Sequence, residues 1–61
     1  MKIFKSWIIE ITQHNVWDKP SKYFLDEDKA KQDNEKRLAE LEKENPNGWF
    51  KSGVDIIEVE E

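Results

Sequence analysis

The sequence predicts an α+β domain in which one helix packs on one face of a three-stranded, antiparallel-type sheet. Three segments rich in β-branched and aromatic residues alternate in the manner of strands. One long segment of helix-forming residues separates the second of them from the third. The chain has 61 residues, which is enough for one domain, so we expect residues 1–61 to form a single domain with the order β-β-α-β.

The first strand is expected at residues 2–12, where neither Gly nor Pro interrupts the pattern. One face of this strand carries Ile3, Lys5, Trp7, Ile9 and Ile11. The opposite face still carries Phe4 and Ile8. Because a strand with one solvated face alternates more cleanly than this, we expect both faces to be covered.

A connection and a short second strand follow. The connection is expected at residues 13–21, which hold the turn-forming residues Asn15, Asp18 and Pro20. Val16 and Trp17 also lie inside it, which is unusual for a solvated loop. The aromatic and apolar side chains of residues 22–25 then predict the second strand.

The helix is expected to begin after Asp26, a favoured N-cap residue, and to run to about Glu44. Its spacing predicts two ion pairs one turn apart, Glu27–Lys31 and Asp33–Arg37. The inward stripe consists of Ala30, Asn34, Leu38 and Leu41. Because only the two leucines are large, the helix is expected to cover a sheet rather than to form the centre of a bundle.

The last strand is expected at residues 49–60, after the helix stop Asn-Pro-Asn-Gly at residues 45–48. Gly53 predicts a bulge within this strand. A right-handed crossover through the helix would carry the chain from the second strand over the first to the third. The sheet order is then 2-1-3, with the first strand central and with one sheet face left without a cover.

The chain has more large apolar side chains than one helix and one sheet face can bury. Each aromatic side chain alone buries about 150–250 Å². One interpretation is a small core of Trp7, Trp17 and Trp49 against residues 13–21. The other is an interaction surface, for which we select Trp7, Val16, Trp17, Tyr23, Trp49, Phe50, Ile57 and Val59.

The size of the chain also points to a partner, because so small a domain usually needs a disulfide, a metal or a second chain. There is no cysteine, so disulfides are excluded, and with His14 as the single histidine the chain has too few of the usual ligands for a zinc site. We therefore predict a homodimer, formed through the open sheet face or through an edge strand. The same surface would equally accept a foreign protein, and the sequence leaves both partners open.

Titratable residues are plentiful, but none forms a catalytic or cofactor-binding pattern. His14 and Asp18 are four residues apart, yet no nucleophile motif surrounds any serine, so His14 is interpreted as a surface residue. The carboxylates follow no calcium-loop spacing, and two glycines cannot supply a phosphate-binding loop. We predict that the protein is no enzyme and uses no cofactor or metal.

The net charge of the chain argues against nucleic acid as a partner. The formal net charge is −4, whereas binding to nucleic acid needs clustered basic residues. A face of carboxylates would instead imitate nucleic acid, an alternative that the basic residues interspersed along the helix weaken. Residues 1–10 lack the pattern of a signal peptide, and no apolar run reaches the roughly 20 residues that cross a bilayer. We expect a soluble cytoplasmic protein with no membrane partner.

Four segments carry a family resemblance: the opening Lys2-Ile3-Phe4, the strand Trp7-Ile8-Ile9-Glu10-Ile11, the helix start Tyr23-Phe24-Leu25-Asp26 and the acidic tail Ile57-Glu58-Val59-Glu60-Glu61. In these, and in its small, charged, cysteine-free composition, the chain resembles small early proteins of bacteriophages. The resemblance implies a protein that binds and blocks a host enzyme or an anti-phage defence protein. The leading hypothesis is a stoichiometric inhibitor acting as a homodimer. The alternatives are a structural or assembly module, and the acidic nucleic-acid mimic.

Overall fold

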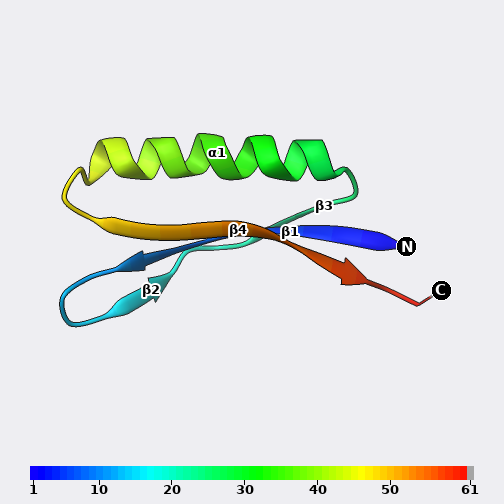
Figure 1. The fold of residues 1–61 in the computed structure, drawn as a ribbon, viewed down its shortest axis with the longest axis horizontal. Helices are drawn as coiled ribbons and strands as arrows, with labels where there is room; N and C mark the ends of the chain where they lie inside the picture. Colours follow the sequence, from blue (N-terminus) through cyan, green and yellow to red (C-terminus); the bar gives the residue numbers. More distant parts are fainter. Residues whose placement is uncertain (61) are drawn as a thin grey trace.

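The computed structural model describes residues 1–60, in which one helix lies along one face of an antiparallel sheet (Figure 1). The elements are β1 (Lys2–Ile11), β2 (Val16–Asp18), β3 (Lys22–Phe24), α1 (Glu27–Glu44) and β4 (Trp49–Glu58). The predicted α+β class is confirmed, as is the central strand: β1 pairs with β4 on one side and with β2 and β3 on the other. Glu61, the end of the predicted domain and of its acidic tail, lies outside the described residues.

The prediction of a plain connection at residues 13–21 is wrong, because β2 lies within it. The chain reverses at residues 12–15, where Thr12 Oγ1 accepts a hydrogen bond from Asn15 N and donates one to Asn15 O, both at 2.9 Å. This turn returns Val16 and Trp17 alongside β1, which explains the apolar residues that looked out of place in a loop.

A bulge separates β2 from β3, which lie along the same edge of β1. Asp18 is opposite Ile9 and Lys22 is opposite Ser6. Three residues of this edge, 19–21, therefore face two residues of β1, and one extra residue is the mark of a β-bulge. Pro20 is the middle residue of the three and has no N–H to give to a ladder.

β4 follows the whole length of β1, and the bulge predicted at Gly53 is absent from it. One register holds from Lys2 opposite Glu58 to Ile11 opposite Trp49. Gly53 instead lies against the indole of Trp7, and a Cβ added to it would come within 2.8 Å of Trp7 Cζ2. Glycine is therefore needed here for a close approach between two strands and not for a bend.

The core lies between α1 and one face of β1. Phe4, Ser6 and Ile8 are the buried residues of β1, and they alternate with partly exposed ones. The buried residues of α1 are Ala30 and Asn34, which belong to the predicted stripe. The helix thus covers the even-numbered face of β1, which has fewer large apolar side chains than the odd-numbered face.

The helix begins and ends as its sequence predicts. Asp26 Oδ1 accepts hydrogen bonds from the backbone N of Asp28 at 2.9 Å and of Lys29 at 3.3 Å, which confirms the N-cap. The two predicted ion pairs are also present, with nitrogen–oxygen distances of 2.8 Å for Lys31–Glu27 and 2.9 Å for Arg37–Asp33. These contacts are local in sequence, which is why residue spacing alone predicts them.

A buried polar cluster lies at the centre of the helix–sheet interface. Asn34 Nδ2 donates to Ser6 Oγ at 3.1 Å and to two backbone oxygens, Trp7 O at 3.0 Å and Gly53 O at 3.1 Å. Ser6 is completely buried, and its hydroxyl donates to Asp33 Oδ2 at 3.1 Å. A buried network whose groups bond to one another fixes one arrangement of helix on sheet.

Arg37 ties the same cluster to the bulge. Its Nε donates to Asp33 Oδ2 at 2.9 Å, and its two terminal nitrogens reach Pro20 O at 2.7 Å and Ser6 O at 3.0 Å. One guanidinium therefore joins α1, β1 and the segment between β2 and β3. The planar fork of arginine suits such simultaneous contacts, which an ammonium group would not reproduce.

Candidate functional site

The face of the sheet opposite α1 is covered by no element of residues 1–60 (Figure 1). Because successive side chains of a strand alternate, it carries the odd-numbered residues of β1 and β4 and their neighbours on β2 and β3. We call this the open face; its members are Ile3, Lys5, Trp7, Ile9, Ile11, Val16, Asp18, Tyr23, Trp49, Lys51, Gly53, Asp55 and Ile57. The second cover expected for β1 is thus absent from residues 1–60 and would have to come from another chain.

The molecule is thin and exposes an unusual amount of surface for its size. Its Cα atoms span 42 × 21 × 12 Å with a radius of gyration of 12.8 Å. A compact domain of this length has a radius of gyration of about 10.5 Å. The accessible area is 4978 Å², whereas a folded monomer of this mass exposes about 4,200 Å². The molecule therefore exposes roughly 800 Å² more than a compact monomer of its mass.

The open face is apolar at both of its ends and also carries Trp7 and Ile9 in the middle of β1. At one end Val16, Ile11 and Trp49 lie next to one another on three neighbouring strands, and Trp49 is 74 % exposed. At the other end Ile3 is opposite Ile57. The charged residues of the face, Lys5, Asp18, Lys51 and Asp55, lie between these ends. The face thus combines apolar anchors with charges of both signs.

Trp7 lies at the centre of the open face, against Gly53 of the neighbouring strand. Its Nε1 is buried and has no hydrogen-bond partner within residues 1–60. An unpaired buried donor costs about 1–3 kcal/mol, so the close packing of this indole against β4 offsets a real penalty.

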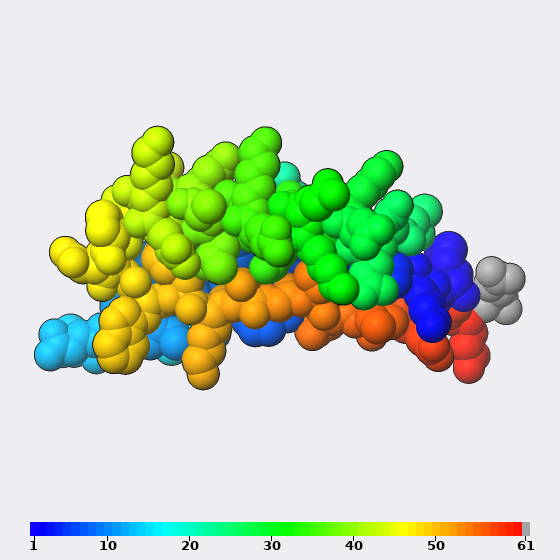
Figure 2. Space-filling model, turned by 45° about the horizontal axis from the view of Figure 1, so that its top comes forward, coloured from blue at the N-terminus to red at the C-terminus, as the bar shows by residue number. Residues whose placement is uncertain are grey.

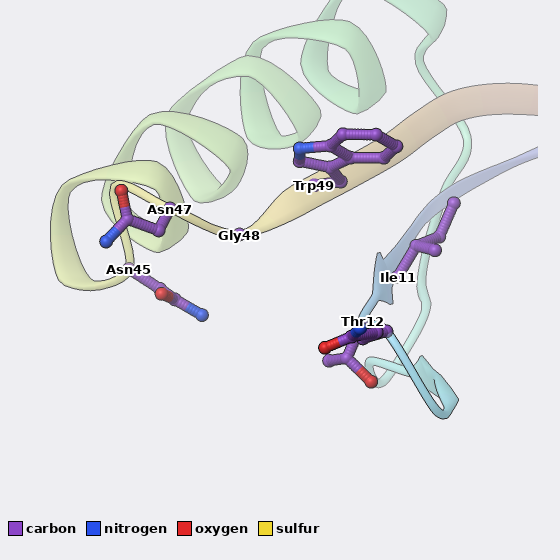
Figure 3. Close-up of a pocket in the computed structure, with 7 residues that line it drawn as sticks. Ile11, Thr12, Asn45, Asn47, Gly48 and Trp49 are labelled. Carbon is purple, nitrogen blue, oxygen red and sulfur yellow. The ribbon is translucent and has the colours of Figure 1, made fainter.

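A pocket of about 510 Å³ continues the open face around one end of the sheet (Figure 3). Its lining consists of Ile11, Thr12, Gln13, Asn45, Asn47, Gly48 and Trp49. Figure 3 shows Asn45 and Asn47 on the side of the helix end and Thr12 on the side of the β1–β2 turn. Ile11 and Trp49 belong to both the pocket and the open face, so the two form one continuous surface with amide groups at its rim.

The structure brings together five of the eight residues selected from the sequence. Trp7, Val16, Tyr23, Trp49 and Ile57 share the open face. Val59 follows the end of β4, and its backbone pairs with that of Met1.

Trp17 and Phe50 lie elsewhere, since both are opposite Glu10 and therefore on the helix side of the sheet. Trp17 is thus separated by the sheet from Trp7 and Trp49. The small core of three tryptophans does not form, because the strand alternation of β2 turns Trp17 away from the other two.

Three isoleucines of the open face, Ile3, Ile9 and Ile11, were not selected from the sequence. Their alternation along β1 was visible, but not which face the helix would cover. Two polar residues could have indicated which face of β1 the helix covers. Ser6 interrupts the apolar pattern of the even-numbered face of β1, and Asn34 interrupts the inward stripe of α1. Two polar residues in facing stripes match each other, as their hydrogen bond at 3.1 Å shows.

The hydrogen-bonded polar side chains Ser6, Asn34 and Arg37 hold the helix on the sheet. Ser6 is fully buried and hydrogen-bonded, so its hydroxyl cannot meet a substrate. His14 is exposed in the turn between β1 and β2. Within residues 1–60, no three His, Cys, Asp or Glu side chains gather as a metal site would require. Nor does the described part of the chain hold a helix long and apolar enough to span a membrane.

Comparisons with known proteins give no relatives: no family model, no curated protein and no solved structure matches the chain. The functional argument therefore depends on the geometry of the open face.

Proposed function

We propose that this chain is a non-enzymatic binding protein whose open face docks onto another protein. The observation that supports it is a set of exposed apolar and aromatic side chains, Trp49, Val16 and Tyr23, on a sheet face without a cover. An interface of standard size buries about 800 Å² on each partner, an area similar to the surplus that this molecule exposes.

The face has the anatomy that protein interfaces share. Trp and Tyr are enriched among the residues that contribute most to binding energy. Trp49 lies at one end of the face, whereas Tyr23 and Asp55 lie further along it, on either side of Lys5. Lys51 lies between these two levels. The charges would select partner and orientation, while the aromatic side chains supply most of the affinity. Because the anchors stand on paired strands, little conformational freedom is lost on binding.

The resemblance to small early bacteriophage proteins suggests the class of protein to which the open face would bind. The partner would be a host enzyme or an anti-phage defence protein in the host-cell cytoplasm, blocked by occupation of its surface. A protein that inhibits without catalysis acts only while it stays bound. Inhibition should therefore rise linearly with added chain and reach its plateau at a fixed stoichiometry. A structural or assembly module would bind its partner with the same face and leave the partner's activity unchanged.

The acidic nucleic-acid mimic receives less support, because basic and acidic side chains alternate on the outer surface of α1. Lys31 Nζ lies 2.8 Å from Glu27 Oε1, and Lys29 and Lys36 are also exposed. Binding by mimicry would weaken steeply as salt is raised from about 0.05 to 0.5 M, whereas an aromatic interface would change little.

The test uses aromatic residues on the two faces as a matched set. Tyr23 (60 % exposed) lies on the open face and Trp17 (55 % exposed) on the helix side, so their replacement removes similar apolar surface. Wild type, Tyr23→Ser, Trp49→Ser and Trp17→Ser would be used as baits in bacterial lysate, and the captured protein would then be purified and titrated calorimetrically. We expect both open-face substitutions to weaken binding by about thirtyfold or more, and Trp17→Ser to leave it unchanged.

Two outcomes would contradict the proposal. If Trp17→Ser weakens binding as much as Trp49→Ser, the partner does not bind specifically to the open face. If all variants bind equally and salt abolishes binding, the acidic mimic is the better description. Assaying the captured enzyme with and without the chain then separates an inhibitor from a structural module.

A further inference from the structure

The two edges of the sheet are built differently. The edge formed by β2 and β3 consists of three-residue strands interrupted by a bulge at Pro20. Short strands, bulges and prolines are the usual devices by which proteins prevent edge-to-edge pairing. The edge formed by β4 has none of them: the strand is 10 residues long, holds one register throughout and contains no proline. Figure 2 shows β4, in orange, uncovered along the length of the molecule.

The backbone groups that β4 offers at this edge follow from its pairing with β1. Met1 N donates to Val59 O at 3.2 Å and Val59 N donates to Met1 O at 2.8 Å, so these two residues exchange both bonds. In an antiparallel pair, such exchanges recur at every second residue. The odd-numbered residues of β4 therefore bond to β1. The even-numbered residues direct their N–H and C=O groups away from it: Phe50, Ser52, Val54, Ile56 and Glu58.

We propose that this edge pairs with β4 of a second copy of the chain, antiparallel and about a two-fold axis through Gly53. Two-fold pairing requires the outward-directed, even-numbered residues of one copy to face those of the other, so the axis must pass through a residue of the strand. With the axis at Gly53, Lys51 is opposite Asp55 of the second copy, twice by symmetry. The strand is therefore complementary in charge to itself in one register.

Neighbouring registers lack this complementarity. An axis at residue 51 or 55 places like charges opposite each other, which is destabilising. An axis at residue 52 or 54 leaves Lys51 opposite Gly53 or Ile57. The axis at Gly53 also sets Phe50 opposite Ile56 of the second copy, which is 57 % exposed in the single chain. It sets Trp49 opposite Ile57 of the second copy, so both faces of the joined strands gain apolar pairs.

The pairing joins two sheets into one and preserves side-chain alternation across the junction. Both helices then lie on one side and both open faces on the other, as one continuous surface. The inference therefore extends the proposed function by doubling the surface that a partner meets, but it depends on different atoms. Tyr23 is on β3, away from the paired edge, and Ser52 points to the helix side and away from the open face.

The first experiment measures mass by sedimentation velocity from about 1 to 100 μM, a range that detects dimers with micromolar dissociation constants. Wild type should sediment at twice 7.3 kDa. Ser52→Pro removes an N–H that points outward, so it should yield a folded monomer with unchanged circular dichroism. Ser52→Ala keeps that N–H and should remain a dimer. A wild type of 7.3 kDa at every concentration would overturn the inference.

The second experiment tests the register and does not depend on the folding of a proline variant. Lys51→Asp places acid opposite acid, and Asp55→Lys places base opposite base, so each should raise the dimer dissociation constant about tenfold or more. The combined Lys51→Asp, Asp55→Lys variant restores opposite charges and should recover to within about threefold of wild type. Because Asp55 is also opposite Lys5 of its own chain, both variants that carry Asp55→Lys also carry Lys5→Asp. Failure of the combined variant to recover would then exclude this register.

The two proposals can fail separately. Tyr23→Ser should weaken binding to the foreign partner about thirtyfold or more and leave the dimer intact, while Ser52→Pro should abolish the dimer. If Ser52→Pro leaves the mass at the dimer value, the copies meet elsewhere and the edge proposal is wrong, whatever the outcome of the partner titration. If a strand of the foreign partner occupies the edge, adding that partner converts dimer to monomeric complex, which would also contradict a permanent β4–β4 pair.

Discussion

The face of the sheet beneath α1 is polar at its centre, whereas the open face is apolar at both ends. Ser6 and Asn34 meet in the middle of the covered face, linked at 3.1 Å, with Phe4 and Ile8 on either side of them along β1. The open face has a larger set of apolar residues and no cover within residues 1–60. A count of apolar side chains would place the helix on the wrong side. The hydrogen bond between Ser6 and Asn34 and the path of the chain hold the helix on the even-numbered face. The more apolar face is therefore free for other contacts.

The sharpest test of this contrast uses two adjacent isoleucines. Ile8 is 1 % exposed beneath the helix, and Ile9 lies on the open face. We expect Ile8→Ala to lower the free energy of unfolding by about 2–5 kcal/mol, which is enough to unfold much of so small a domain. Ile9→Ala should cost well under half as much, because its neighbours are already solvated. Urea denaturation followed by circular dichroism measures both. Equal losses would mean that the open face is covered in solution, for instance by a second copy.

The polar centre of the covered face gives the next largest effect. Asn34→Ala removes the amide that donates to Ser6 Oγ and to the oxygens of Trp7 and Gly53. We expect a loss of about 1–3 kcal/mol, because buried acceptors lose their donor and no water replaces it easily. Gln32→Ala, on the exposed side of the same helix, is the control and should be neutral or slightly stabilising. Were Asn34→Ala to increase stability, the polar cluster would not be what holds the helix on this face.

Sequence reasoning succeeded where the deciding contacts are local. The Asp26 cap and the two ion pairs of α1 depend on residues within one helical turn, and spacing alone predicts them. β1 was predicted because its long alternating pattern leaves little choice. The predicted strands end within one or two residues of those observed: 12 against 11, 25 against 24 and 60 against 58.

The errors arose where contacts outside the segment itself decide its structure. β2 has three residues, too few for a pattern, and it is a strand only because the turn at 12–15 brings it against β1. The role of Gly53 depends on Trp7, which is far away in sequence. The interaction residues were predicted by type, so Trp17 was grouped with Trp49 although the alternation of β2 places it on the other side. Residue types predicted an interaction surface, but the strand register determines which residues lie on the same face.

The contact between Gly53 and Trp7 offers a smaller effect, this time on the open face. A Cβ at Gly53 would come within 2.8 Å of Trp7 Cζ2, so Gly53→Ala must displace the indole. The ring can tilt towards the uncovered side, and we expect a loss of only about 1 kcal/mol together with a shift in tryptophan fluorescence. In a Trp7→Ala background the same substitution should cost nothing, which a double-mutant cycle measures. An undiminished cost in that background would mean that β4 itself, and not the indole, requires glycine.

The outer surface of α1 belongs to neither face and provides the smallest effect. The hydrogen bond from Lys31 to Glu27, at 2.8 Å, and the charge of that carboxylate raise the pKa of Lys31. A raised folded-state pKa stabilises the protein fully below the unfolded-state value, about 10.4, and this stabilisation disappears as pH rises through the folded-state value. Lys31→Gln should therefore lower the urea midpoint slightly at pH 7 and low salt, and not at all once the lysine is neutral. Since the pair is exposed, salt should reduce the difference as well. A difference that persists at high pH would show that the side chain acts through its packing on the helix and not through its charge.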